Sequence, residues 1–201
     1  MNSHSNPPPS ILTNLSHHWL RFYHTPWFVF TVTTLISFLV YLITLAPSVT
    51  LEDSGEFITA AHYLGVPHPP GYPSWTIFGW FFSHIPYGNI AWRINLSSAV
   101  YGALAIGILS TVTFSSGRVV LSRVLHKLDA KGRLFMATAI RYSSIAAGLI
   151  LAFTDVMWSQ AVIAEVYTLN ALFLALMLYF LYKWTQHPEK YYFLYALAFC
   201  F

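Results

Sequence analysis

The sequence predicts an all-α, polytopic transmembrane protein. Of its 201 residues 56% are hydrophobic and 8% are charged, whereas a soluble domain carries about 25% charged residues. Such a chain has too few charges to cover a soluble surface, and it is too hydrophobic to be disordered. Its apolar residues also gather in runs long enough to cross a bilayer. The single cysteine, Cys200, excludes a disulfide framework and a cysteine zinc site.

Four spans are expected, followed by the start of a fifth. The third and fourth form a helical hairpin with Asp155 and Glu165 near its turn. A fifth apolar run opens at Tyr191 and is still running at Phe201, so we expect the chain to be the N-terminal part of a longer protein. The first run is too long and starts too late for a cleaved signal peptide. The four spans cover about residues 27–45, 94–114, 142–160 and 166–183.

The positions of Lys and Arg predict the orientation. Nine of the ten basic residues lie on one side of the predicted spans, and only Arg93 lies on the other. The basic side is therefore expected to be cytoplasmic, together with a mostly disordered tail over residues 1–26. Basic and apolar residues alternate over 118–141, which we interpret as a helix on the inner leaflet, serving as an anchor or as a lipid site. Because the basic residues follow the topology, the net charge of +3 does not indicate nucleic-acid binding.

The outer loop, residues 46–92, is not loop-like in composition. Two apolar helices are expected at about 54–64 and 74–82, both too short to span and therefore placed at the membrane interface. Between them, the sequence HPPGYP at 68–73 holds three prolines and a glycine, which fix a rigid, non-helical backbone. Aromatic residues on the loop would anchor it at the interface.

Three of the seven acidic residues follow the first span within five positions: Glu52, Asp53 and Glu56. Carboxylates at a membrane interface are costly unless they serve a partner or a function. The structural alternative is a capping box, in which Asp53 and Glu56 stabilise a helix N-terminus. Their closeness would raise the pKa of one of them, as a general base requires.

A second acidic pair, Asp155 and Glu165, falls on the same side of the membrane. Either carboxylate could simply lie in a solvent-exposed turn, but Glu165 is followed by the polar residues Tyr167, Thr168 and Asn170. His68 is either a site residue or a histidine held in a tight turn, and Arg93 either snorkels or pairs with a carboxylate or phosphate.

These motifs resemble the N-terminal part of the protein O-mannosyltransferase-like membrane family, within the GT-C glycosyltransferase superfamily. The resemblance covers roughly residues 35–180 and rests on two separate groups of motifs. The motifs are LAP at 45–47, EDSGEF at 52–57, GVPHPPGYP at 65–73, WSQ at 158–160 and AEVYTLN at 164–170.

The resemblance implies an enzyme that moves a sugar, expected to be mannose, from a polyprenyl-phosphate donor to a protein Ser or Thr hydroxyl. Transfer would invert the anomeric carbon on the non-cytoplasmic face. The resemblance gives Asp53 the role of base, with Glu56 orienting it or the acceptor, and lets Arg93 hold the donor phosphate. It implies substrate-binding roles for Glu52, His68, Tyr72, Arg93, Glu165, Tyr167 and Asn170.

The sequence offers no decisive set of metal ligands and indicates no cofactor, and the polyprenyl-phosphate sugar is expected as the donor substrate. The expected partners are the bilayer, that donor and a protein acceptor, and the expected location is the bacterial inner membrane rather than the endoplasmic reticulum. Since members of the family are longer, we expect activity to need residues beyond this chain.

Two other classes of protein are alternatives. A transporter or channel would also carry membrane carboxylates, although more often in the middle of a span. A non-catalytic assembly or lipid-binding protein would need no base. Replacing Asp53 with Asn separates these classes, because only the enzyme would lose transfer while keeping its fold.

Overall fold

The computed structural model describes residues 25–51, 53–125 and 127–200, and all regular structure in these ranges is α-helical. The predicted fold class is therefore confirmed. Most of the tail at 1–26 and the carboxylate Glu52 lie outside the described residues. The helices are α2 (Pro26–Ile43), α3 (Ser54–Tyr63), α4 (Pro73–Ser83), α5 (Ile90–Leu125), α6 (Ala130–Ala152), α7 (Asp155–Ala161), α8 (Tyr167–Gln186) and α9 (Tyr192–Cys200).

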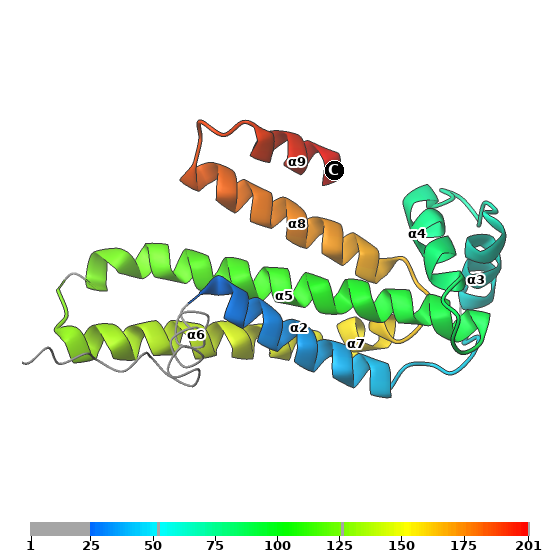
Figure 1. The fold of residues 1–201 in the computed structure, drawn as a ribbon, viewed down its shortest axis with the longest axis horizontal. Helices are drawn as coiled ribbons and strands as arrows, with labels where there is room; N and C mark the ends of the chain where they lie inside the picture. The colour runs from blue at the N-terminus through cyan, green and yellow to red at the C-terminus, as the bar shows by residue number, and fades with distance from the viewer. Residues whose placement is uncertain (1–24, 52, 126, 201) are drawn as a thin grey trace, which may run out of the picture.

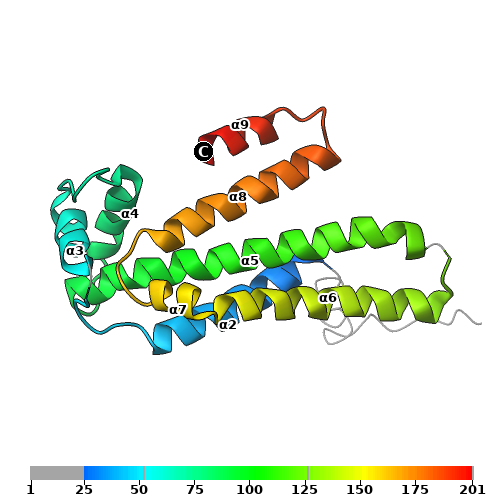
Figure 2. The same cartoon turned by 180° about the vertical axis from the view of Figure 1, so that it is seen from behind.

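Among the described residues, four helices are long and apolar enough to cross a membrane: α2, α5, α6 and α8. The long helix α5 runs through the middle of the molecule, with α2 and α6 on one side and α8 on the other (Figures 1 and 2). Small residues let these helices approach closely. A Cβ added to Gly107 would lie 2.0 Å from Thr34 Oγ1, and one added to Gly148 would lie 1.9 Å from Ser110 Oγ.

The two helices expected in the outer loop are present as α3 and α4, and they lie together at one end of α5 (Figure 1). Buried side chains join them to α5 and to the segment that leads into α8. This core includes Phe57 of α3, Trp75 of α4, Ile94 and Tyr101 of α5, and Leu169 of α8. The outer loop is therefore packed as a unit against the membrane helices, which gives its polar residues fixed positions.

The inner-leaflet helix expected over 118–141 does not exist as a separate element. Helix α5 continues to Leu125, and α6 begins at Ala130. The break comes at Asp129, whose carboxylate accepts a hydrogen bond from the N–H of Gly132 at 2.9 Å and so starts α6. The alternating basic and apolar residues are therefore the end of one long helix, α5, and the start of another, α6.

The third helix also differs in its bounds from the expected span at 142–160. Helix α6 ends at Ala152, and the short helix α7 follows after a turn. Thr154 causes the break, since its hydroxyl accepts the N–H of Met157 and caps α7. Asp155 then lies at the start of α7 and Glu165 just before α8, at the end of the molecule that holds α3 and α4 (Figure 2).

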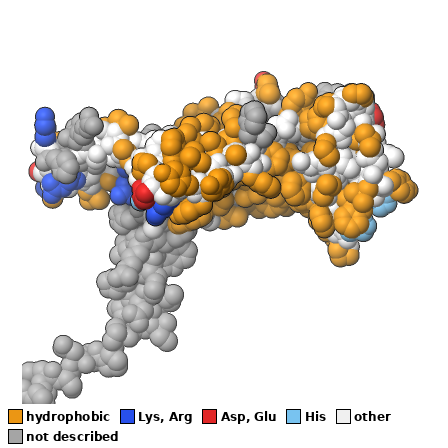
Figure 3. Space-filling view, turned by 90° about the horizontal axis from the view of Figure 1, so that it is seen from above, with side chains coloured by type: hydrophobic (Ala, Val, Ile, Leu, Met, Phe, Trp, Pro, Cys, Tyr) orange, Lys and Arg blue, Asp and Glu red, His pale blue; other side chains and the backbone are white. Residues whose placement is uncertain are grey.

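Charge is unevenly distributed on the surface. Figure 3 shows Lys and Arg side chains mainly toward the α5–α6 turn and histidines at the opposite end, with a broad hydrophobic surface between them. This separation is what a membrane-spanning protein with one basic side would show.

Candidate active site

The candidate site begins at the N-terminus of α3. Phe57 is buried and Ser54 is fully buried, so their side chains fix the rotation of this first helical turn. Asp53 immediately precedes the helix, and Glu56 follows one turn later on the exposed side. Both carboxylates therefore point away from the protein core and toward the loop that follows α3.

The proline-rich loop returns over this turn. Helix α3 ends at Leu64, which has a left-handed backbone with φ 51°, and Gly65 N–H donates to Ala60 O at 2.8 Å. Gly71, with φ 91°, closes a second turn by donating to His68 O at 3.0 Å. The chain reversal between these two turns brings His68 beside Glu56, which is 12 residues earlier.

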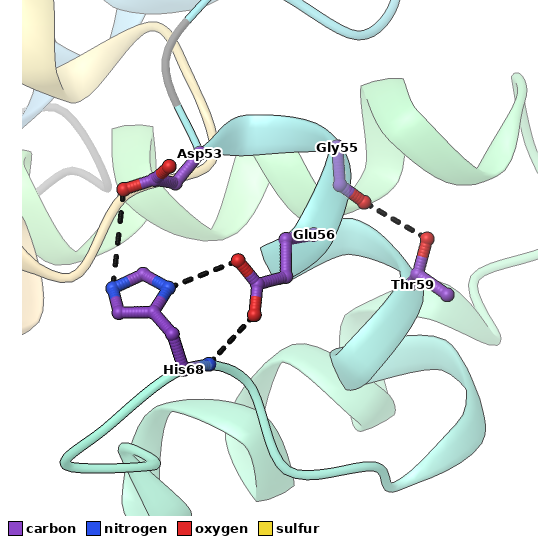
Figure 4. Close-up of polar contacts among 5 residues, drawn as sticks. All are labelled: Asp53, Gly55, Glu56, Thr59 and His68. Carbon is purple, nitrogen blue, oxygen red and sulfur yellow. Dashed lines mark hydrogen bonds and ion pairs between the residues drawn. The ribbon is translucent and has the colours of Figure 1, made fainter.

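His68 is bound by two carboxylates (Figure 4). Its backbone N–H donates to Glu56 Oε1 at 2.6 Å, and its ring Nδ1 lies 3.0 Å from Glu56 Oε2. On the other side of the ring, Nε2 lies 3.9 Å from Asp53 Oδ2. The side chains of Asp53, Glu56 and His68 are 62%, 46% and 38% exposed, so all three are open to a substrate.

The contacts shift the pKa values of the pair in opposite directions. The hydrogen bond that the His68 ring makes to the Glu56 carboxylate raises the pKa of His68, assisted by the negative charges of Glu56, Asp53 and Glu165. The two hydrogen bonds from His68 lower the pKa of Glu56. The raised carboxylate pKa that we expected does not fall on Glu56, because both of its oxygens accept hydrogen bonds from His68.

Neither carboxylate caps α3 in the way that a capping box requires. Asp53 occupies the N-cap position but its side chain accepts no capping hydrogen bond. The Glu56 side chain bonds to His68 and does not reach back to the start of the helix. The side-chain hydrogen bonds of a capping box are therefore not formed by these two residues, although Glu56 remains an acidic residue in the first turn of α3, and both carboxylates form a cluster with His68.

Glu165 joins the second motif to this cluster. It is only 4% exposed, and its charge contributes to the raised pKa of His68. Its backbone carbonyl accepts the indole N–H of Trp75 at 3.0 Å and the hydroxyl of Ser98 at 3.4 Å. Helices α4 and α5 thus hold the segment before α8 against the outer loop.

The remaining expected site residues lie in three places. Tyr72 packs its ring against His68 at 6.0 Å between centroids and against Phe57 at 5.6 Å, so it supports the cluster. Tyr167 and Asn170 are exposed on the first turn of α8. Arg93 lies apart from the cluster: its guanidinium donates to the backbone carbonyls of Ser83, Tyr87 and Gly88 at 2.8–2.9 Å.

Sequence reasoning gave no site role to Trp75 or Ser98, although both position Glu165. Trp75 was visible only as one aromatic residue among several on the outer loop, and a serine on a membrane helix carries no signal. His62 of α3 has its Nδ1 3.2 Å from Ser83 Oγ of α4 and so helps to join the two short helices.

The cluster has the residue types of a cation site. One ligand atom from each of Asp53, Glu56 and His68 lies within 4.8 Å of the others. These three residues could hold a divalent cation after small movements, with Asp53 and the ring nitrogen as ligands. In the observed arrangement, however, the Glu56 carboxylate already contacts the His68 ring directly, at 3.0 Å.

Comparison with known proteins supports the family that the sequence motifs suggested. The sequence profile of the family described as "Protein O-mannosyl-transferase TMEM260 N-terminal domain" matches residues 53–201. The chain belongs to this family. The match starts at Asp53 and contains Glu56, His68 and Glu165, so the resemblance drawn from the motifs is confirmed.

Two curated relatives carry the same name. The mouse protein O-mannosyl-transferase TMEM260 is 36% identical over 140 residues, which is 69% of this chain and 17% of the mouse protein. The Dictyostelium discoideum protein O-mannosyl-transferase tmem260 is 32% identical over 150 residues, 73% of this chain and 16% of that protein. The chain therefore spans about a sixth of the length of these relatives. No solved structure matches the chain significantly.

Proposed function

We propose that the protein is a membrane O-mannosyltransferase. It takes mannose from a polyprenyl-phosphate donor and transfers it to a Ser or Thr hydroxyl of a protein on the non-cytoplasmic face. The names of the two relatives support mannosyl transfer. The observation that carries the proposal for this chain is the open cluster of Asp53, His68 and Glu56 at the end of the helices.

Asp53 is the better base of the two carboxylates. Both oxygens of Glu56 are engaged by His68, and those hydrogen bonds lower its pKa, so Glu56 accepts a proton poorly. Asp53 is more exposed, and its nearest ionic partner is His68 Nε2 at 3.9 Å. That distance is too long for a hydrogen bond, which leaves the Asp53 oxygens available to an acceptor hydroxyl.

The reaction proceeds in one displacement. Asp53 removes the proton from the acceptor hydroxyl as the hydroxyl oxygen attacks the anomeric carbon of mannose. The bond between that carbon and the phosphate oxygen breaks, and polyprenyl phosphate leaves with the electron pair. A single base and a single displacement invert the anomeric configuration, with no need for a covalent intermediate on the protein.

Glu56 and His68 have a positioning role in this proposal. Glu56 fixes the imidazole ring and favours its cationic form. The cationic ring attracts the Asp53 carboxylate and holds it over the start of α3. Glu165 and Tyr72 support His68 from behind.

The relatives are both eukaryotic. This favours the endoplasmic reticulum over a bacterial inner membrane as the location, with the cluster in the lumen.

The proposal is tested by incubating purified full-length protein with labelled polyprenyl-phosphate mannose and a Ser/Thr-containing acceptor protein. The expected product is mannose in an alkali-labile linkage to the acceptor, with the anomeric configuration opposite to that of the donor. Retained configuration would contradict the one-base mechanism. Absence of transfer by a folded full-length protein would contradict the enzymatic function.

A further inference from the structure

A second site lies at the start of α8, on the same end of the molecule as the acidic cluster (Figures 1 and 2). There, α6, α7 and α8 surround an open cavity of about 540 Å³. One part of its wall is apolar, with Leu151, Val156 and Met157, and another part is polar, with Gln160, Tyr167 and Thr168. A cavity with both kinds of wall fits an amphipathic ligand.

Two polar atoms at this cavity have no hydrogen-bond partner among the residues that the structure describes. Thr168 is fully buried, yet its Oγ1 is unpaired, and the buried Oε1 of Gln160 is unpaired as well. An unpaired buried polar atom costs about 1–3 kcal/mol, so such atoms usually mark a missing partner. Both residues line the cavity, which indicates that the partner is a ligand in it.

The helix itself adds donors at the same place. Helix α8 has 20 residues, its N-cap residue Val166 provides no capping side chain, and its first turn holds no acidic residue. The first hydrogen bond of the helix at this end runs from Asn170 N–H to Val166 O, so the N–H groups of Tyr167, Thr168 and Leu169 precede the helical ladder. Together with the helix dipole, such an end favours an anion.

We infer that this cavity holds the lipid phosphodiester of the donor, with its phosphate at the N-terminus of α8 and its first isoprenoid units against Leu151, Val156 and Met157. The Thr168 hydroxyl donates to the phosphate. The Gln160 amide supplies an acceptor or, turned over, two donors to the phosphate or the attached sugar. This assignment rests on the proposed function, because it takes the donor to be a polyprenyl-phosphate sugar.

The acidic residues Asp155, at the start of α7, and Glu165, just before α8, lie on the segments around the cavity, so the phosphate has to be held by neutral donors and the helix end. A sugar joined to a polyprenol through phosphate carries one negative charge, which neutral donors and a helix end can stabilise without a basic side chain. Arg93, the residue expected to hold the phosphate, is already bonded to three backbone carbonyls. The site is also near the base, since Thr168 lies three residues after Glu165, whose charge acts on His68.

The test measures equilibrium binding of polyprenyl-phosphate mannose to purified full-length protein. The variants are Thr168→Val, Gln160→Leu and Thr168→Ser, which keeps the hydroxyl. Thr185→Val at the other end of α8 is the matched control, since its hydroxyl bonds within its own helix. We expect Thr168→Val to weaken binding about tenfold, as loss of a hydrogen bond to a charged group predicts. Thr168→Ser and Thr185→Val should bind like the wild type.

Binding of three control ligands shows whether the cavity recognises the lipid-linked sugar phosphate or another lipid or phosphate. Free polyprenol should bind weakly and equally to all variants, and phosphatidylglycerol vesicles and inorganic phosphate should not compete. Equal affinity of the wild type and Thr168→Val for the donor would overturn the inference, as would equal competition by phosphatidylglycerol.

Transfer is measured on the same proteins, so that the two proposals fail separately. If the wild type transfers mannose and Thr168→Val keeps both its affinity and its KM for the donor, this site is wrong and the enzyme stands. If binding depends on Thr168 but the wild type transfers nothing, the site stands as a lipid-phosphodiester site and the proposed function is wrong.

Discussion

Replacing Trp75 with Phe tests whether the two acidic motifs form one site. Trp75 is 2% exposed, and its indole N–H donates to the backbone carbonyl of Glu165 at 3.0 Å. Phenylalanine keeps an aromatic ring in the core but has no donor. In this variant the Ser98 hydroxyl, at 3.4 Å, would still donate to that carbonyl.

The expected cost can be worked out from these contacts. Losing the hydrogen bond to a buried carbonyl costs about 1–2 kcal/mol, toward the lower end because Ser98 remains. The smaller ring leaves roughly 40 Å² less apolar surface buried, or about 1 kcal/mol at about 25 cal/mol/Å². We therefore expect the free energy of unfolding to fall by about 2–3 kcal/mol.

Trp80→Phe is the matched control on the same helix. The Trp80 ring is half-buried, and no hydrogen bond from its indole nitrogen is found within the described residues. Its replacement should cost under about 1 kcal/mol. The assay is denaturant unfolding in detergent followed by circular dichroism, together with mannosyl transfer on folded protein, which should fall more for Trp75→Phe. Equal destabilisation by the two variants, or full transfer by folded Trp75→Phe, would refute the link through Glu165.

Four further predictions concern the site. Glu56→Gln should shift the alkaline limit of transfer to lower pH, because it removes the carboxylate that raises the pKa of His68; an unchanged pH profile would contradict the positioning role. The Glu56–His68 ion pair should stabilise the wild-type protein most between about pH 4.5 and 6.5, since the lowered pKa of Glu56 and the raised pKa of His68 lie outside this window. If the difference in unfolding free energy between the wild type and Glu56→Gln did not change with pH, this prediction would be wrong. Arg93→Lys should destabilise the protein by about 1–3 kcal/mol, because one ammonium group cannot replace a guanidinium that donates to three carbonyls. The KM for the donor should stay unchanged. A raised KM would indicate that Arg93 binds the donor. Transfer should survive EDTA, because His68 and Glu56 compensate each other without a cation, whereas loss of activity restored by a divalent cation would show that Asp53, Glu56 and His68 bind a metal.

The sequence was sufficient for the membrane architecture because that signal is compositional. Long apolar runs and short apolar helices between them can be recognised without knowing any contact, and α3 and α4 begin and end within one residue of the expected positions. The bounds of α5 and α6 were harder to predict, because α5 continues past its apolar span and the start of α6 depends on a cap by Asp129.

The sequence allowed the residues of the site to be predicted, but not which of them contact each other. Asp53, Glu56 and His68 could be selected from the sequence, yet the bond between His68 and Glu56 depends on a chain reversal whose path no spacing rule fixes. The role of Arg93 was equally open, since a lone arginine on the outer side fits a phosphate as well as backbone carbonyls. The part played by Trp75 depends on a contact 90 residues away along the chain, which one sequence does not reveal.

The most direct test of the base is the rate of mannosyl transfer by Asp53→Asn, compared with Glu56→Gln and the wild type at equal amounts of folded protein. Asp53 makes no capping hydrogen bond, and its ionic contact with His68 is exposed and 3.9 Å long, so Asn at this position should change stability by less than about 1 kcal/mol. We predict that kcat falls about 10²- to 10⁴-fold for Asp53→Asn, as loss of a general base predicts, and only about tenfold for Glu56→Gln. Transfer by Asp53→Asn at the wild-type rate, or a larger loss for Glu56→Gln than for Asp53→Asn, would contradict the assignment of Asp53 as the base.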